Sequence, residues 1–188
     1  MPKITESKIL ILATDGFEKS ELFVPLDKLK EAGAEVVVAA PEKRPIKSWD
    51  EKDWGETIDA DCAVADVDVS DFDAIVLPGG QINPDLLRVD TDAMAVIKTF
   101  LKSGKVVAAI CHAPWLLAEA GVLKGLDVTS YHSIKTDLIN AGANWHDEET
   151  VADKGIVTSR SPKDLDAFVS KIIEEVEEGR HEMRDLAA

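Results

Sequence analysis

The sequence predicts an α/β protein in which a mostly parallel sheet carries helices on both faces. Two observations predict this class: short apolar runs alternate with segments of helical periodicity, and those runs lack the polar alternation of half-exposed strands. The size of the chain predicts the number of domains. A chain of 188 residues without repeats or linkers is expected to form one domain, residues 1–188, with its core between about residues 8 and 176.

The first half of this pattern is a strand, a helix and a second strand. Residues 8–14 are a continuous apolar run that is too short for a helix and reads as a buried strand. Leucines at helical spacing follow over residues 22–29, with Pro25 predicting either a kink or a helix start nearby. Residues 35–40 form the next strand, so the unit is a right-handed parallel crossover.

The rest of the chain repeats this alternation after one interruption. Residues 41–61 are charged, contain Trp49 and Trp54 and show no clean period, so we expect an exposed hairpin or excursion there. Further strands are expected at residues 74–77, 105–110, 127–130 and 155–159, and helices at residues 91–102, 114–120 and 134–140. Ser161 and Pro162 open a final amphipathic helix that extends to about Val176.

Composition and charge exclude several classes of function. The chain is 45% hydrophobic and 30% charged, with 21 basic and 36 acidic residues and a net charge of −15, so direct contact with nucleic acid or with an anionic membrane is disfavoured. The N-terminus is polar, and the apolar runs are shorter than the ~20 residues that span a bilayer. The two cysteines form no disulfide framework, so we expect a cytoplasmic protein.

The most informative stretch surrounds Cys111. A buried strand leads directly into Cys111, and a helix begins at Pro114, which is the layout of a strand-to-helix elbow that displays a reactive side chain. Unpaired N–H groups at the start of that helix favour a thiolate, so the pKa of Cys111 is expected to be lowered, and they can also hold an oxyanion. The alternative is an inert, buried cysteine; the position at a strand end favours the functional reading.

Other strand ends supply the remaining candidates. Gly79 and Gly80 end a neighbouring strand and form either a plain loop or, as the nearby cysteine elbow favours, donors of N–H groups to an oxyanion, with His112. Glu18, which follows the first strand, is either a surface charge or a partly protonated acid beside Cys111. His132 is either a plain loop residue or a wall of the pocket. Histidine spacing suggests no metal site, and the sequence lacks the glycine-rich and Walker motifs of nucleotide phosphate sites.

Five stretches together resemble the ThiJ/PfpI family, the superfamily of the parkinsonism-associated deglycase, and its PfpI-like branch in particular. They run in family order over about residues 8–176. The stretches are ILATDGFEKSEL, AIVLPGG, VVAAICHAPWLLAEAGVLKG, TSYHSIKTDLINAGANWHDEE and VTSRSPKDL. The resemblance implies a flavodoxin-like three-layer sandwich that forms homodimers or, in the PfpI-like branch, hexamers.

The resemblance also implies roles for individual residues. Cys111 would be the nucleophile, Glu18 the acid that hydrogen-bonds it, and His112 the adjacent catalytic histidine. Asp85 matches an acidic position that reaches the histidine of a neighbouring subunit. Tyr131 would line the pocket with His132, and no metal or cofactor is implied.

The combined reading is a cofactor-independent thiol enzyme that acts on small reactive carbonyls or on glycated proteins, as a glyoxalase or deglycase in stress protection. An intracellular cysteine peptidase is the second hypothesis. It ranks lower because two adjacent side chains on a turn are expected to diverge, which makes His112 an awkward base for Cys111. A third hypothesis, from another class, is a non-catalytic redox sensor or stress chaperone based on an easily oxidised cysteine.

Overall fold

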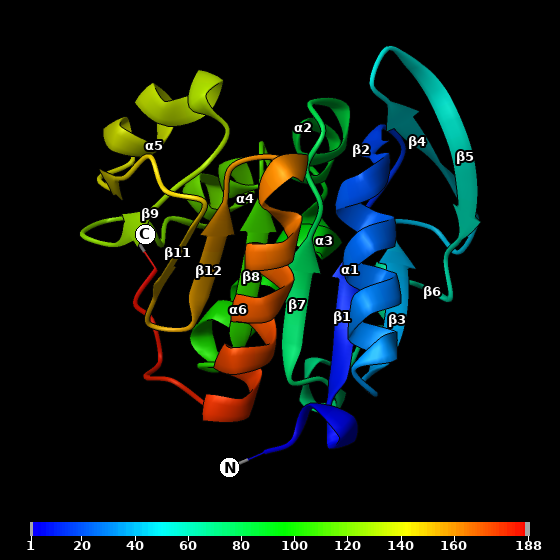
Figure 1. The fold of residues 1–188 in the computed structure, drawn as a ribbon, viewed down its shortest axis with the longest axis horizontal. Helices are drawn as coiled ribbons and strands as arrows, with labels where there is room; N and C mark the ends of the chain where they lie inside the picture. The colour runs from blue at the N-terminus through cyan, green and yellow to red at the C-terminus, as the bar shows by residue number, and fades with distance from the viewer. Residues whose placement is uncertain (1, 187–188) are drawn as a thin grey trace.

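The computed structural model describes residues 2–186 and shows one seven-stranded sheet between two layers of helices (Figure 1). The strands of this sheet, in chain order, are β1 (Lys8–Leu12), β3 (Glu35–Ala40), β6 (Cys62–Ala63), β7 (Ala74–Leu77), β8 (Val106–Ile110), β11 (Thr150–Asp153) and β12 (Ile156–Ser159). Their order across the sheet is β11-β12-β8-β7-β1-β3-β6. All pairs are parallel except β11 with β12, which confirms the predicted flavodoxin-like class.

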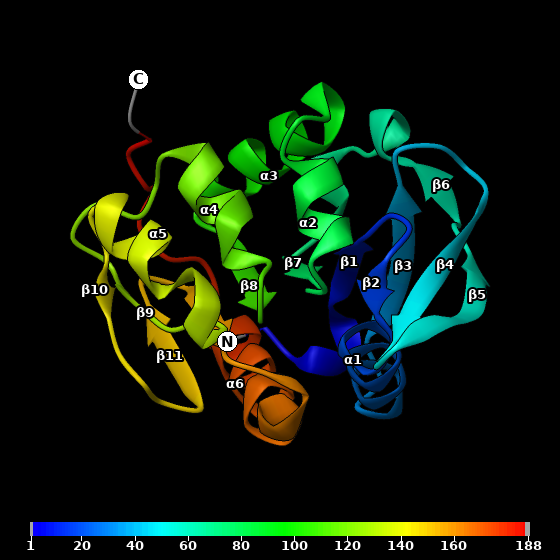
Figure 2. The same cartoon turned by 90° about the horizontal axis from the view of Figure 1, so that it is seen from above.

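Helices cover both faces of this sheet. The helices of the chain are α1 (Lys19–Glu31), α2 (Ile82–Leu87), α3 (Thr91–Lys102), α4 (Pro114–Ala120), α5 (Lys135–Asn140) and α6 (Leu165–Glu178). Of these, α5 packs on α4 and β10 at one edge of the molecule (Figure 2). Seen from above, α1 and α6 lie on one face and α2, α3 and α4 on the other (Figure 2). Each face has its own buried apolar cluster: Leu22, Leu29 and Phe168 belong to the first, and Ile97 and Leu117 to the second.

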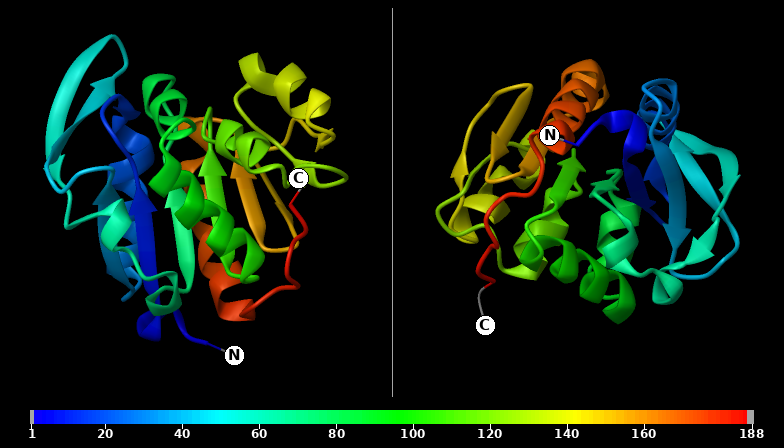
Figure 3. Two further views of the ribbon diagram at one scale, coloured as in Figure 1. Left: turned by 180° about the vertical axis from the view of Figure 1, so that it is seen from behind. Right: turned by 90° about the horizontal axis from the view of Figure 1, so that it is seen from below.

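Two smaller sheets flank this core. β4 (Pro45–Asp50) and β5 (Asp53–Asp59) form an antiparallel hairpin, which β2 (Phe17–Glu18) joins alongside β4. The hairpin confirms the expected excursion of residues 41–61 and stands beside α1 at the edge of the molecule (Figure 3). At the opposite edge, β9 (Asp127–Val128) pairs with β10 (Asn144–Trp145), so the strand expected at residues 127–130 lies outside the main sheet.

The structure corrects two helix boundaries. α1 begins at Lys19, earlier than the leucine spacing indicated, and Pro25 lies inside it. A proline there leaves the carbonyl of Glu21 without a helical N–H partner. The final helix opens with a 3₁₀ turn, Pro162–Asp164, before α6 begins at Leu165. Within residues 2–186, no helix is both long and apolar enough to cross a bilayer.

Candidate active site

Cys111 sits on the elbow between β8 and α4, at the carboxyl end of the sheet. Its φ of 64° lies in the left-handed region, which costs a non-glycine residue of order 1 kcal/mol and is typical of functional turns. Its N–H donates to the Ser159 carbonyl at 3.0 Å, and its carbonyl accepts from Tyr131 N–H at 2.9 Å. The elbow is therefore fixed from both sides, and the side chain is 7% exposed.

The carboxyl beside this thiol belongs to Glu21, which corrects the prediction for Glu18. Glu21 is fully buried, and its Oε2 accepts from Gly79 N–H at 2.9 Å. A methyl group on Gly79 would lie 2.4 Å from Glu21 Oε2 and 2.7 Å from Cys111 Cβ, so the carboxyl and the thiol-bearing carbon meet over Gly79. The physical reason is helical phase, because Glu21 lies on the buried face of α1 whereas Glu18 precedes the helix and is half-buried.

Burial raises the pKa of both groups of this pair. It raises the pKa of Glu21 to about 8, and the charge of Glu18 adds to the rise. Burial and the neighbouring Glu21 carboxylate raise the pKa of the Cys111 thiol, whereas the backbone N–H groups of Gly80 and His112 act in the opposite direction. The expected lowering of the thiol pKa is therefore wrong. Groups coupled this closely titrate as a pair. Both are protonated below about pH 8, and above that pH the pair holds one proton that the two groups share.

His112 contacts the same sulfur from the other side. Its Nδ1 lies 3.1 Å from Cys111 Sγ, and its Nε2 lies 3.1 Å from Ser133 Oγ. The ring is stacked on Tyr131 at 4.9 Å. The expectation that the two adjacent side chains diverge is therefore wrong, since the left-handed backbone at Cys111 lets them converge. Burial and the nearby His132 lower the pKa of His112 to about 4, so the imidazole is neutral at pH 7.

The two glycines have different tasks. The N–H of Gly79 already donates to Glu21, so this glycine is unsuited to the expected oxyanion role. The N–H groups of Gly80 and His112 both act on the sulfur and remain the candidates for holding an oxyanion. Gly80 has φ +81°, and a Cβ there would lie 2.4 Å from the Gly16 carbonyl oxygen, so only glycine fits.

These groups open into a cavity of about 480 Å³, a size typical of small-molecule sites. The elbow, the β4–β5 hairpin and the segments after β1, β7, β9 and β12 contribute the lining. The lining residues are Gly16, Glu18, Trp49, Glu51, Gln81, Ile82, Cys111, His112, Tyr131 and Pro162. Two predicted residues lie elsewhere. His132 is exposed and lines a neighbouring cavity, and Asp85 is exposed on α2.

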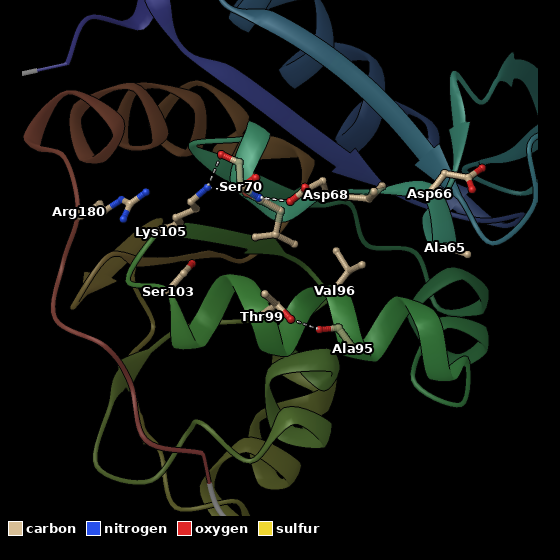
Figure 4. Close-up of a pocket in the computed structure, with 12 residues that line it drawn as sticks. Ala65, Asp66, Asp68, Ser70, Ala95, Val96, Thr99, Ser103, Lys105 and Arg180 are labelled. Atoms are coloured by element: carbon tan, nitrogen blue, oxygen red, sulfur yellow. Dashed lines mark hydrogen bonds between the residues drawn. The ribbon is translucent and has the colours of Figure 1, made fainter.

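A larger pocket of about 670 Å³ lies at the amino ends of the strands (Figure 4). Lys105, its central cation, donates to the carbonyls of Val69, Ser70 and Phe72, so its ammonium is already satisfied. Sites in doubly wound sheets lie at the carboxyl ends of the strands, which favours the Cys111 cavity.

Within residues 2–186, one group of side chains has the spacing of metal ligands: Glu175, Glu178 and His181. It lies around the last turn of α6, where His181 Nε2 is 3.1 Å from Glu175 Oε2.

Gly79→Ala is expected to separate the carboxyl of Glu21 from the thiol. The new methyl would also lie 2.7 Å from the Ile110 carbonyl oxygen, so backbone must move. We expect kcat/KM to fall by about 10²-fold, as displaced catalytic groups commonly cause, and the unfolding free energy to fall by about 1–3 kcal/mol. Gly125→Ala is the control, because φ is +77° there and nothing lies within 4 Å. It should lose stability and keep activity; equal kinetics for the two variants would contradict this account.

The raised pKa of Glu21 also predicts a pH-dependent stability. The folded state keeps the proton of Glu21 up to about pH 8, whereas the unfolded chain releases it near 4.5. The contribution of this group to the unfolding free energy is therefore greatest below pH 4.5 and declines as the pH rises to about 8. Urea denaturation between pH 5 and 8.5 should show a smaller decline in Glu21→Gln than in the unsubstituted protein. Equal declines in the two proteins would show that the pH dependence comes from a group other than Glu21.

A buried thiol on an elbow, with a shared-proton carboxyl and a neutral imidazole, defines a cysteine-centred site in a flavodoxin-like fold. The chain belongs to the DJ-1/PfpI family, whose model matches residues 7–175. Deglycase TK1284 of Thermococcus kodakarensis is 45% identical over 166 residues, 88% of this chain and 97% of that protein. The putative cysteine protease YraA of Bacillus subtilis is 48% identical over 161 residues, covering 86% and 93%.

The fold likeness agrees with this assignment. The crystal structure of Drosophila melanogaster DJ-1beta superposes with a TM-score of 0.81 at 32% identity and covers 95% of both chains.

Three parts of the site were not predicted from the sequence: Glu21, Ser133 and the part of the β4–β5 hairpin that lines the cavity. Glu21 could have been found from the sequence, since it shares the buried face of the helix with Leu22. No sequence pattern indicated Ser133 or the hairpin residues.

Proposed function

We propose that the protein is a cofactor-independent cysteine enzyme that acts on reactive carbonyls or on their protein adducts. The observation that carries the proposal is the buried Cys111, which contacts His112 and meets Glu21 over Gly79. The name of the deglycase relative supports the substrate class. A stress-protective role in the cytoplasm fits this chemistry, because 2-oxoaldehydes damage proteins by adding to their nucleophilic side chains.

The first step forms a bond between Cys111 and an aldehyde. The Glu21 carboxylate takes the thiol proton as the sulfur attacks the carbonyl carbon, and a pKa of about 8 suits a base that works near neutral pH. The N–H groups of Gly80 and His112 stabilise the charge that develops on oxygen. Glu21 then returns the proton to that oxygen, which gives a neutral hemithioacetal.

The following steps convert a 2-oxoaldehyde into a hydroxy acid. A base removes the proton on the former aldehyde carbon, and the resulting enediol regains a proton at the neighbouring carbon, which leaves a thioester. Neutral His112, fixed between Cys111 and Ser133, is suited to this transfer. Water then hydrolyses the thioester and restores the thiol. Methylglyoxal would give lactate, and no external oxidant or reductant is consumed.

Lactate formation from methylglyoxal tests this proposal directly. In D₂O the product should carry deuterium at the carbon next to the carboxylate, because the enediol is reprotonated from exchangeable protons. Mass spectrometry of the product provides the measurement, and protein blocked with iodoacetamide is the control. Lactate at the level of the blocked protein would refute the proposal.

Peptide hydrolysis is the second candidate function. The 3.1 Å contact between Cys111 Sγ and His112 Nδ1 favours it more than the sequence did, since thiol peptidases use a neighbouring imidazole. Cleavage of an unfolded protein substrate by material free of contaminating proteases would establish the peptidase activity.

We also propose that the protein forms a homo-oligomer in which Asp85, exposed on α2, approaches the site of a neighbouring subunit.

A further inference from the structure

The mouth of the Cys111 cavity carries two carboxylates that lack a cationic partner. Glu18 and Glu51 both line the cavity, and neither makes an ion pair within the described residues 2–186. Lys19, next to Glu18 in the sequence, is already held by Asp50 and Glu56, each at 3.1 Å. Lys52, next to Glu51, is exposed and does not line the cavity. Lysine and arginine are absent from the described lining. The mouth is therefore locally negative beyond the overall charge of the chain.

The pKa of Glu18 reflects these neighbouring acids. Burial raises the pKa of Glu18, and the nearby charges of Asp50 and Glu51 raise it further. An approaching cation stabilises the ionised form of such a carboxyl group strongly, because it relieves the repulsion between the neighbouring acids. An anion at the same position meets two like charges, and solvent screens the half-buried Glu18 less than it screens the exposed Glu51.

The hairpin adds an aromatic surface to these charges. Trp49 lines the cavity together with Glu18 and Glu51, and it pairs with Glu18 across β2 and β4. Its ring packs edge-to-face on that of Trp54, with 5.6 Å between the ring centroids. An indole face beside carboxylates suits a planar guanidinium, which stacks on aromatic rings and donates to carboxylates in a fork. An ammonium group gains the charge attraction without this match of shape.

We propose that Glu18, Glu51 and Trp49 select substrates by charge and favour carbonyl adducts carried on a guanidinium-type cation. In this arrangement the adduct carbon lies at Cys111 while the cationic part stays at the mouth between the two carboxylates. Neutral aldehydes enter without this gain, and anionic carbonyl compounds are disfavoured. Glu18 is thus a specificity residue, in place of the catalytic acid that the sequence indicated. The substrate class rests on the proposed function, whereas the charge selection does not.

The charge selection is measured with two thiol reagents of opposite charge. 2-Aminoethyl methanethiosulfonate is a cation and 2-sulfonatoethyl methanethiosulfonate an anion, and both form a mixed disulfide with a thiol and release a sulfinate. Modification of Cys111 is followed by mass spectrometry of its peptide, which separates it from Cys62. The cation-to-anion rate ratio, divided by that of a small model thiol, is expected to exceed about tenfold, as fields in charged clefts commonly give.

Two variants separate the mouth from the overall charge. In Glu18→Gln/Glu51→Gln the ratio should fall about tenfold. In Asp59→Asn, an exposed carboxylate at the far end of the same hairpin, it should stay within about twofold. Glu18 makes no capping bond to α1, so the double variant keeps its fold, which circular dichroism checks. Equal ratios in the double variant and the unsubstituted protein would overturn the proposal.

The substrate arm uses methylglyoxal adducts of N-acetylarginine methylamide, which is cationic, and of N-acetylcysteine methylamide, which is neutral. The kcat/KM ratio of the first to the second should fall about tenfold in the double variant and remain unchanged in Asp59→Asn. If neither adduct is turned over, the proposed function fails while the reagent ratio still decides the charge selection. If both are turned over with a ratio that the double variant leaves unchanged, the carboxylates do not select the substrate.

Discussion

Cys111→Ser is expected to reduce kcat/KM for methylglyoxal by at least about 10³-fold. A serine hydroxyl is far less acidic than a thiol and needs a stronger base to become a nucleophile. Glu21, with a pKa of about 8, and His112, with a pKa of about 4, are too weak for this. The substitution changes one atom, and a serine at a φ of 64° has the same conformational strain as the cysteine, so folding should remain intact. Lactate formation under initial-rate conditions provides the measurement.

Cys62→Ser is the matched control for this substitution. Cys62 lies in β6 at the edge of the sheet, outside the lining of the Cys111 cavity, and should keep kcat/KM within about twofold, as for a surface change without a catalytic role. A Cys111→Ser protein that keeps more than a tenth of the activity would show that the sulfur is not the nucleophile. The carbonyl chemistry proposed above would then need another group.

Glu21→Gln is expected to separate the reactivity of the sulfur from the turnover of the enzyme. The amide keeps the shape of the carboxyl but cannot take or return a proton, so kcat should fall by about 10²–10⁴-fold, the usual contribution of a general base. The Glu21 carboxylate raises the pKa of Cys111, so its removal should lower that pKa. Iodoacetamide should then label Cys111 faster at alkaline pH while lactate forms more slowly.

Glu18→Gln is the matched control, three residues earlier in the chain. Its carboxyl lines the cavity mouth without meeting the thiol over Gly79, so methylglyoxal turnover should change by less than about fivefold, as expected for a charge at a distance. If Glu18→Gln lost as much turnover as Glu21→Gln, the assignment of the catalytic acid from the sequence would be restored.

The fold was largely predictable because buried parallel strands leave an unambiguous pattern. The runs at residues 74–77 and 91–102 became β7 and α3 with the same bounds. The antiparallel edge strand β11 was missed because its pattern of partly buried residues lacks a continuous apolar run. α2 was missed because a six-residue helix with a proline in it has no measurable period.

The site was predictable at the level of the elbow and less so at its contacts. The strand end located Cys111, since the carboxyl edge of a parallel sheet is defined by topology. Glu21 was not among the candidates because its position on the buried face depends on the start of α1, and the helix begins three residues earlier than the first leucine of its stripe. The sign of the pKa shift at Cys111 depended on burial and on Glu21, which sequence spacing does not specify.

The shared proton of Cys111 and Glu21 is tested most directly by the pH profile of Cys111 alkylation between pH 6 and 10. In the unsubstituted protein the rate should rise with pH and level off near pH 8, the pKa of Glu21, because the carboxylate then opposes further ionisation of the sulfur. In Glu21→Gln the rate should continue to rise through pH 8. Identical profiles for the two proteins, or a plateau below pH 7 in both, would contradict the account.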